Sequence, residues 1–330
     1  YKYHLIFLII ILSIPSLKLI SGPSIKLIES INPATQGYLG GMGLPIIFSW
    51  FIGGLLSAGV AFVIGKICLG LRSDYLAIST LLISGIVISV IKHEEWLSRG
   101  VKNVIGLKRP APFEVNLQKS EWFMTLIDKI HFWAPTTKDV IISSSGIFVK
   151  LCFTIIFSIT LLTLLYLSER AVNSPWGRMM RAIRDNETAA KAMGKNIVKQ
   201  QLNIFMIGSA IIGFAGAMLV TYDGLFTPSS YQPLRYTFLI WVMVLLGGSG
   251  NNYGSILGAF VVWFIWIESA PIALFIINFC TFFLEYNNPV KLHLIESVPY
   301  FRYLMMGVGL LLVMRYKPEG LLPEKKISFK

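Results

Sequence analysis

The residue types that carry out chemistry in enzymes are scattered through this chain of 330 residues. Its four histidines, His4, His93, His131 and His293, include no pair at the spacing of metal ligands on one helix face. The nearest approach to a phosphate-binding loop, Gly59 to Lys66, has the wrong spacing and no following serine or threonine. We therefore expect no metal site, no cofactor and no nucleotide site of this kind.

The composition predicts an integral membrane protein. Hydrophobic residues make up 55% of the chain and charged residues only 14%, and the mean hydropathy is +0.67. The net charge of +12 arises from loops beside apolar segments, which favours contact with membrane lipid headgroups over nucleic acid. Cys68, Cys152 and Cys280 all lie in apolar runs, so neither a disulfide framework nor a zinc cluster is indicated.

The apolar segments predict an all-α, polytopic bundle of transmembrane helices in a single permease domain. A helix needs about 20 residues to cross roughly 30 Å of hydrocarbon. The sixth candidate is short and ends in glycines, and the seventh contains Glu268, Ser269 and Pro271, so we expect one of them to be re-entrant or split. About eight spans are expected, at residues 4–21, 45–70, 75–92, 145–167, 202–222, 235–248, 254–277 and 298–315.

Lysine and arginine set the expected orientation. They crowd residues 168–200 and the tail 316–330, which places both segments in the cytoplasm. Counting back through the spans puts Arg72 inside and residues 93–144 in an extracytoplasmic loop. Trp96, Trp122 and Trp133 in that loop fit either an aromatic belt at the membrane interface or a platform for a partner protein.

The cytoplasmic segment 178–194 is a charged, helix-prone island between two apolar segments. Ser174 and Pro175 form a capping residue and a first-turn proline, so a helix should begin near Trp176. Gly194 should end the helical segment. Small residues and arginines together favour a docking helix, while a basic loop that only enforces topology is the alternative.

Two further groups of residues have expected positions at or within the membrane. Glu268 either has a role on a solute path or in helix packing, or it marks the outer end of a helix broken at Pro271. Asp74, followed by Tyr75, should cap an inner helix start. The glycines of the next run predict a tight turn between closely packed helices, and they are Gly247, Gly248, Gly250 and Gly254.

Glu187, Ala189, Ala190 and Gly194 resemble the cytoplasmic coupling motif of ABC-importer permeases, with Thr188 inserted before the alanines. The arginines before this motif are similar to those of the branched-chain amino acid permease subfamily. From about residue 45 onward the chain resembles the M-type membrane subunit of such importers, with urea and short-amide permeases as close relatives. The matching runs are LRSDYLAIST at 71–80, LLGGSGNNYGSILGA at 245–259 and RYKPEGLLP at 315–323.

The resemblance implies a permease subunit in the bacterial inner membrane that is not itself an enzyme. It would pair with a second homologous permease subunit, two cytoplasmic ATPase subunits and a periplasmic solute-binding protein. Because the family's opening helices need more than the 70 residues present before LRSDYLAIST, we expect that an N-terminal portion is missing. The residues that would couple to the ATPase are Arg178, Arg181, Arg184, Glu187, Ala189, Ala190 and Gly194.

The alternatives to branched-chain amino acid import are a permease for urea or short-chain amides, an exporter or ion-coupled secondary carrier, and a membrane-embedded enzyme. The last lacks paired intramembrane acids or a nucleophile beside a base. Hydropathy cannot select the solute, because a few side chains in the path decide it.

Overall fold

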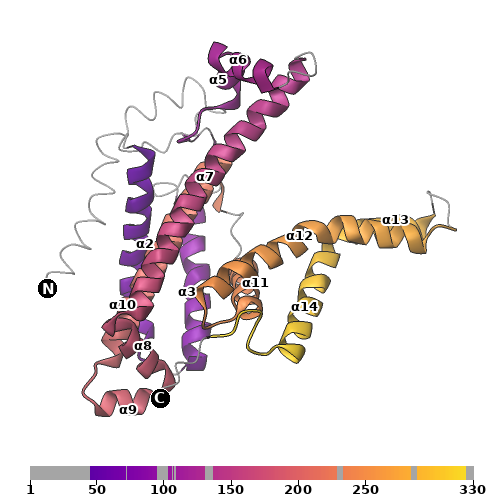
Figure 1. Cartoon of the computed structure of the whole chain (residues 1–330). Helices are drawn as coiled ribbons and strands as arrows, with labels where there is room; N and C mark the ends of the chain where they lie inside the picture. The colour runs from indigo at the N-terminus through magenta and orange to yellow at the C-terminus, as the bar shows by residue number, and fades with distance from the viewer. Residues whose placement is uncertain are drawn as a thin grey trace. The chain divides into compact units, whose positions relative to one another are not determined.

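The computed structural model describes residues 45–71, 73–94, 103–105, 107, 109–130, 137–228, 233–283 and 288–324 (Figure 1). The chain divides into two compact units, Tyr1–Tyr231 and Gln232–Lys330, which are considered one at a time. The expected first span at 4–21, the position of Arg72 and the last six residues lie outside the described part.

The helical membrane bundle is confirmed, and of the seven predicted spans that lie in the described part, six are long enough to cross a membrane. Six described helices are long and apolar enough to cross a membrane, and each overlaps a predicted span. The segment predicted at 235–248 forms α11 (Pro233–Gly247), whose 15 residues extend only ~22 Å at 1.5 Å per residue. The six helices are α2 (Ile46–Cys68), α3 (Ser73–His93), α7 (Lys138–Asn173), α10 (Ile197–Asp223), α12 (Asn252–Cys280) and α14 (Val298–Tyr316).

Small residues allow α2 and α10 to pack closely along their length in the first unit (Figure 1). A Cβ atom at Gly54 would lie 2.9 Å from the carbonyl oxygen of Ala210, so only glycine fits there. Trp50 Nε1 donates a buried hydrogen bond of 2.9 Å to Thr221 Oγ1. Helices α2 and α10 are therefore held together by close packing of their backbones and by a hydrogen bond that is shielded from water.

The segment expected to form the outer loop is partly folded, and its last residues belong to α7, which begins at Lys138. It contains β1 (Val104–Ile105), α5 (Glu114–Gln118) and α6 (Glu121–Ile130). β1 pairs antiparallel with β2 (Leu225–Phe226), just beyond the end of α10. α5 and α6 pack on α7 through a buried cluster formed by Ala111, Leu117, Phe123, Ile127, Val149 and Phe153.

In the second unit, α12 is one continuous helix of 29 residues, so the expected break at Pro271 is wrong for this segment. A proline removes one backbone hydrogen bond, but membrane helices tolerate it where neighbouring helices and side chains compensate. The Ser269 hydroxyl donates to the Trp266 carbonyl at 3.0 Å. Residues on one side of α12 are buried with α11 and α14, and α13 (Pro289–Glu296) precedes α14.

Candidate functional site: the α7–α8 elbow

The segment expected to face the cytoplasm forms two short helices, and the first of them begins where the sequence predicts. α8 spans Pro175–Asp185, and only Ser174 separates it from the last residue of α7. The Ser174 side chain accepts a hydrogen bond from the Gly177 amide at 3.2 Å and donates one to the Ala171 carbonyl at 2.7 Å. The cap thus fixes the direction in which the chain leaves α7.

Gly177 allows the first turn of α8 to lie directly on the last turn of α7. A Cβ atom there would overlap the carbonyl oxygens of Ala171 and Val172 and would lie 2.6 Å from the Val172 carbonyl carbon. No L-residue with a side chain fits this approach without a backbone shift. We call residues 171–177 the elbow.

Two arginines of α8 reach back to the elbow. Arg178 Nη1 donates to the Asn173 carbonyl at 3.5 Å, and Arg181 Nη2 donates to the Val172 carbonyl at 3.4 Å. These are long hydrogen bonds, but they place positive charge at the helix C-terminus, where unpaired carbonyls make it favourable. Arg178 and Arg181 therefore attach α8 to α7 within this chain.

The predicted helix from Arg178 to Gly194 is interrupted, so the expectation of one continuous helix is wrong. α8 ends at Asp185 and α9 covers Glu187–Ala192. Asn186 between them has an extended backbone (φ −153°, ψ 99°), and its side chain accepts from the Ala189 amide at 3.0 Å. Asparagine competes for backbone amides in this way and so begins a new helix. Gly194, with φ +75°, follows the end of α9 as predicted.

The two alanines of the motif face different ways. Ala190 is buried in a small cluster with Ile183 and Ile197, whereas Ala189 is exposed. Arg178, Arg184, Glu187 and Gly194 are exposed as well. Arg184 Nε lies 3.2 Å from Asp185 Oδ1, and Gln201 donates to Glu187 Oε1 at 3.4 Å. Sequence reasoning missed Met193, which is 79% exposed beside the motif.

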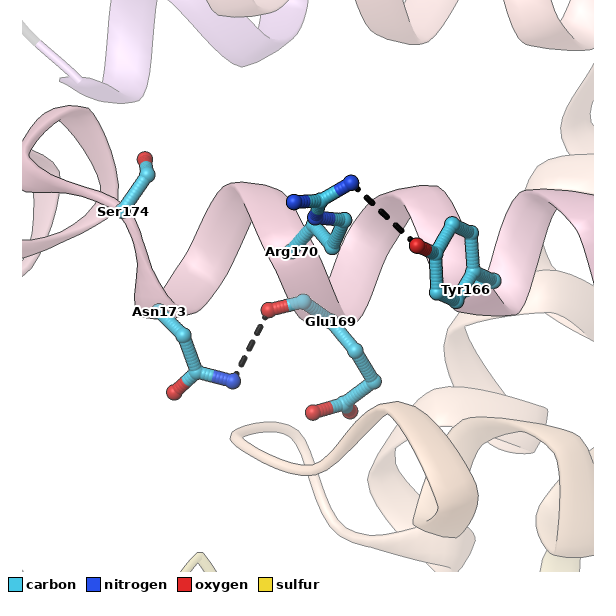
Figure 2. Close-up of a pocket in the computed structure, with 5 residues that line it drawn as sticks. All are labelled: Tyr166, Glu169, Arg170, Asn173 and Ser174. Carbon is cyan, nitrogen blue, oxygen red and sulfur yellow. Dashed lines mark hydrogen bonds between the residues drawn. The ribbon is translucent and has the colours of Figure 1, made fainter.

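Polar residues line an open hollow on the last turns of α7 (Figure 2). Arg170 Nη1 donates to the Tyr166 hydroxyl at 3.2 Å, and Asn173 Nδ2 donates to the Glu169 carbonyl at 2.9 Å. Tyrosine and arginine at the end of an apolar helix are typical of a membrane interface. The elbow follows directly on the turns of α7 that carry these residues.

The second unit brings together two sequence runs whose paired residues are 75 positions apart. The amides of Leu321 and Leu322 donate to the carbonyls of Leu246 and Gly247, both at 2.9 Å. The tail thereby supplies donors to carbonyls at the end of α11 that the helix leaves unpaired. Both runs were recognised in the sequence, but the contact between them was not predicted.

Glycines make this tail contact and the adjacent turn possible. Gly248 (φ +119°) and Gly320 (φ +84°) have left-handed backbones, and a Cβ on Gly320 would overlap Gly248. A Cβ on Gly254 would lie 2.6 Å from the Gly247 carbonyl oxygen, which confirms the predicted tight turn between packed helices. Gly250 similarly lies against the Glu324 side chain.

The remaining predicted site residues belong to other helices than α7, α8 and α9. Glu268 is half-buried within α12, and so it does not mark a helix end at Pro271. α3 begins at Ser73, which places Asp74 in its first turn, and Tyr75 is exposed.

Arg302, in α14, was not singled out from the sequence, although it is a basic residue inside a predicted span. Its guanidinium carbon lies 5.5 Å from the centre of the Trp266 ring. Within the described part of the chain, its buried Nε has no hydrogen-bond partner. A cation in this position is a candidate to meet a ligand.

Together, the six membrane-length helices of the described part and an elbow leading to two short polar helices define a multi-pass membrane protein with a polar two-helix segment between two of its spans. The model of the family described as "Branched-chain amino acid transport system / permease component" matches residues 30–314. The chain belongs to this family, and it is a transport subunit.

Curated relatives agree with this assignment. The "Probable branched-chain amino acid transport permease protein LivM" of Methanocaldococcus jannaschii is 30% identical over 278 residues, which cover 83% of this chain and 68% of the relative. The high-affinity LivM permease protein of Salmonella typhimurium is 25% identical, over 84% of this chain and 58% of its own length. The fructose import permease protein FrcC of Rhizobium meliloti is 30% identical over 91 residues, covering 26% of this chain and 25% of its own. No solved structure matches.

Proposed function

We propose that this chain is the membrane permease subunit of an ATP-binding-cassette importer that carries branched-chain amino acids across a bacterial inner membrane. The family match over residues 30–314 and the relatives named as LivM support the class and the solute. A second homologous permease subunit would complete the path, and a periplasmic solute-binding protein would deliver the solute. Two cytoplasmic ATPase subunits would hydrolyse ATP.

The elbow is the observation that supports coupling between the ATPase subunits and the membrane helices. α7 is a single helix of 36 residues, ~54 Å long, and one residue joins it to α8. The Ser174 cap, the close approach at Gly177 and the bonds from Arg178 and Arg181 hold α8 against it. A displacement of α8 would therefore move α7 as a unit, which is the requirement for passing motion from an ATPase to the membrane.

Exposure divides the predicted coupling residues into two roles. Arg184, Glu187 and Ala189 are exposed and would contact the ATPase, with Gly194 ending the contact surface. Arg181 and Ala190 are directed toward α7 and the small buried cluster, and would hold the segment in position. Arg178 is exposed and also bonded to α7, so it would serve both.

We assign the solute path within the described chain to α12 and α14, which contact one another. An amino acid carries a carboxylate and an ammonium group, and each is costly to move through hydrocarbon without a counter-charge. Arg302 offers a positive group whose Nε has no partner in the described part, and Glu268 offers a carboxylate on the neighbouring helix. The glycines at 247, 248, 250 and 254 would keep the α11–α12 turn closely packed beside it.

Uptake by the complete complex tests this function. The chain is reconstituted in proteoliposomes with its co-encoded partners, and labelled leucine and urea are supplied in parallel with and without ATP. ATP-dependent leucine accumulation is expected. Urea accumulation alone would reassign the solute while keeping the coupling mechanism. Uptake that follows an ion gradient and ignores ATP would refute the importer class.

A further inference from the structure

α6 packs against α7 at the end opposite to the elbow (Figure 1). Phe123 and Ile127 are buried in the cluster that joins the two helices. The Trp122 ring lies edge-on to Phe148 of α7, with ring centres 5.8 Å apart. The level of α6 along α7 is thus fixed close to residue 148.

Three sides of α6 bear on how it is placed, and a fourth, narrower flank carries Met124, which is 38% exposed. At 100° per residue, Glu121, Thr125, Asp128 and Lys129 form a polar arc, and Phe123 and Ile127 lie opposite to it. Between these sides runs a third, apolar flank. It consists of Trp122, Leu126 and Ile130, which are 56%, 39% and 66% exposed.

The charges of α7 indicate where the membrane begins. Between Lys150 and Glu169 the helix has no charged residue over residues 151–168, a distance of ~27 Å that matches the hydrocarbon thickness. Arg170 and Glu169 mark the elbow end, so Lys150 marks the other boundary. Phe148, and Trp122 beside it, lie about one helical turn outside the hydrocarbon, at headgroup level.

We propose that α6 is an interfacial helix whose Trp122, Leu126 and Ile130 flank enters the lipid bilayer at this end of α7. The same helix would turn its polar arc to water and its Phe123 side to α7. α7 also exposes apolar residues near this level, including Ile147, Leu151 and Ile155, each more than half exposed. A lipid surface accounts for all three sides of the helix at one depth.

Burial of apolar surface, and not attraction between charges, would hold α6 at the membrane. α6 carries Glu121, Asp128 and Lys129, and so it has no excess of positive charge to attract anionic lipid. Insertion would depend on apolar area and on the aromatic ring. The depth of α6 should therefore be the same in zwitterionic and anionic bilayers.

Spin labels on adjacent residues test the proposal in the full chain. Cys68, Cys152 and Cys280 are replaced by alanine, and a single label is placed at Leu126→Cys or at Thr125→Cys as the matched control. Collisions with oxygen, which concentrates in lipid, and with a water-soluble nickel chelate are measured in phosphatidylcholine vesicles and in vesicles containing phosphatidylglycerol. The label at 126 should collide mainly with oxygen and the label at 125 mainly with nickel, in both lipids.

Two outcomes would overturn the inference. Nickel collisions at 126 as frequent as at 125 would place the flank in water, and few collisions with either reagent at 126 would show that protein covers it. Ile130→Cys provides a second position on the same flank, where the oxygen preference should recur. Trp122→Phe should remove part of the fluorescence quenching by brominated lipid, and unchanged quenching would also contradict the proposal.

Discussion

Gly177→Ala should uncouple ATP hydrolysis from transport. The added Cβ would lie 2.6 Å from the Val172 carbonyl carbon, whereas carbon atoms in ordinary contact are about 3.5 Å apart or more. α8 must therefore move by ~1 Å relative to the end of α7. Overpacking of this kind costs about 1–3 kcal/mol, and the gain in helix propensity on replacing glycine returns at most ~1 kcal/mol. Because the overlapping atoms belong to the backbone and cannot turn aside, the upper part of this range applies, about 2–3 kcal/mol, and the net cost in the elbow is about 1–2 kcal/mol.

The assay compares leucine uptake with ATP hydrolysis in proteoliposomes that contain the complete complex. A cost of about 1.4 kcal/mol lowers the population of the packed elbow roughly tenfold relative to an unpacked one, so uptake per ATP should fall by up to roughly tenfold. Hydrolysis itself should continue, because the change lies outside the ATPase subunits. Gly146→Ala in α7 is the matched control, since a Cβ there meets nothing within 4 Å.

The reasoning would be refuted if Gly177→Ala kept the normal ratio of uptake to hydrolysis. It would be refuted equally if Gly146→Ala lowered that ratio as much, because the effect would then belong to α7 in general. A melting temperature measured for each variant separates uncoupling from global unfolding.

Arg184→Glu should lower both uptake and ATPase stimulation without changing the melting temperature, because the side chain is exposed on α8, and full uptake would count against docking at this residue. Gly320→Ala should destabilise the second unit by about 2–4 kcal/mol through left-handed strain and overlap with Gly248, seen as a lower melting temperature; an unchanged value would show that the tail contact is dispensable. Thr221→Val should cost about 1–3 kcal/mol by leaving the buried Trp50 N–H unpaired, and equal stability to the parent chain in denaturant unfolding would contradict this.

Local signals in the sequence predicted the elements well. The cap at Ser174, the proline after it and the stop at Gly194 depend on residues within a few positions of each other, and each is found where expected. Apolar runs likewise placed the six long helices, because their length is dictated by the bilayer. The glycine-rich turn after α11 was recognised for the same reason.

Competition and distant contacts explain what the sequence could not predict. Asn186 can continue a helix or cap a new one, and its bond to the Ala189 amide favours the cap. Pro271 is a helix breaker in water, yet it lies inside α12. The docking of Leu321 and Leu322 on the end of α11 joins residues 75 positions apart, for which no local pattern exists.

Cross-linking from two adjacent alanines tests the coupling segment most directly. In a chain without its native cysteines, Ala189→Cys or Ala190→Cys is combined with the partner ATPase subunits and a short cysteine-to-lysine cross-linker. Because Ala189 is exposed and Ala190 is buried, the account predicts a cross-link to the ATPase from position 189 and little from position 190. An assembled complex that gives no cross-link from position 189, or an equal yield from both positions, would contradict it.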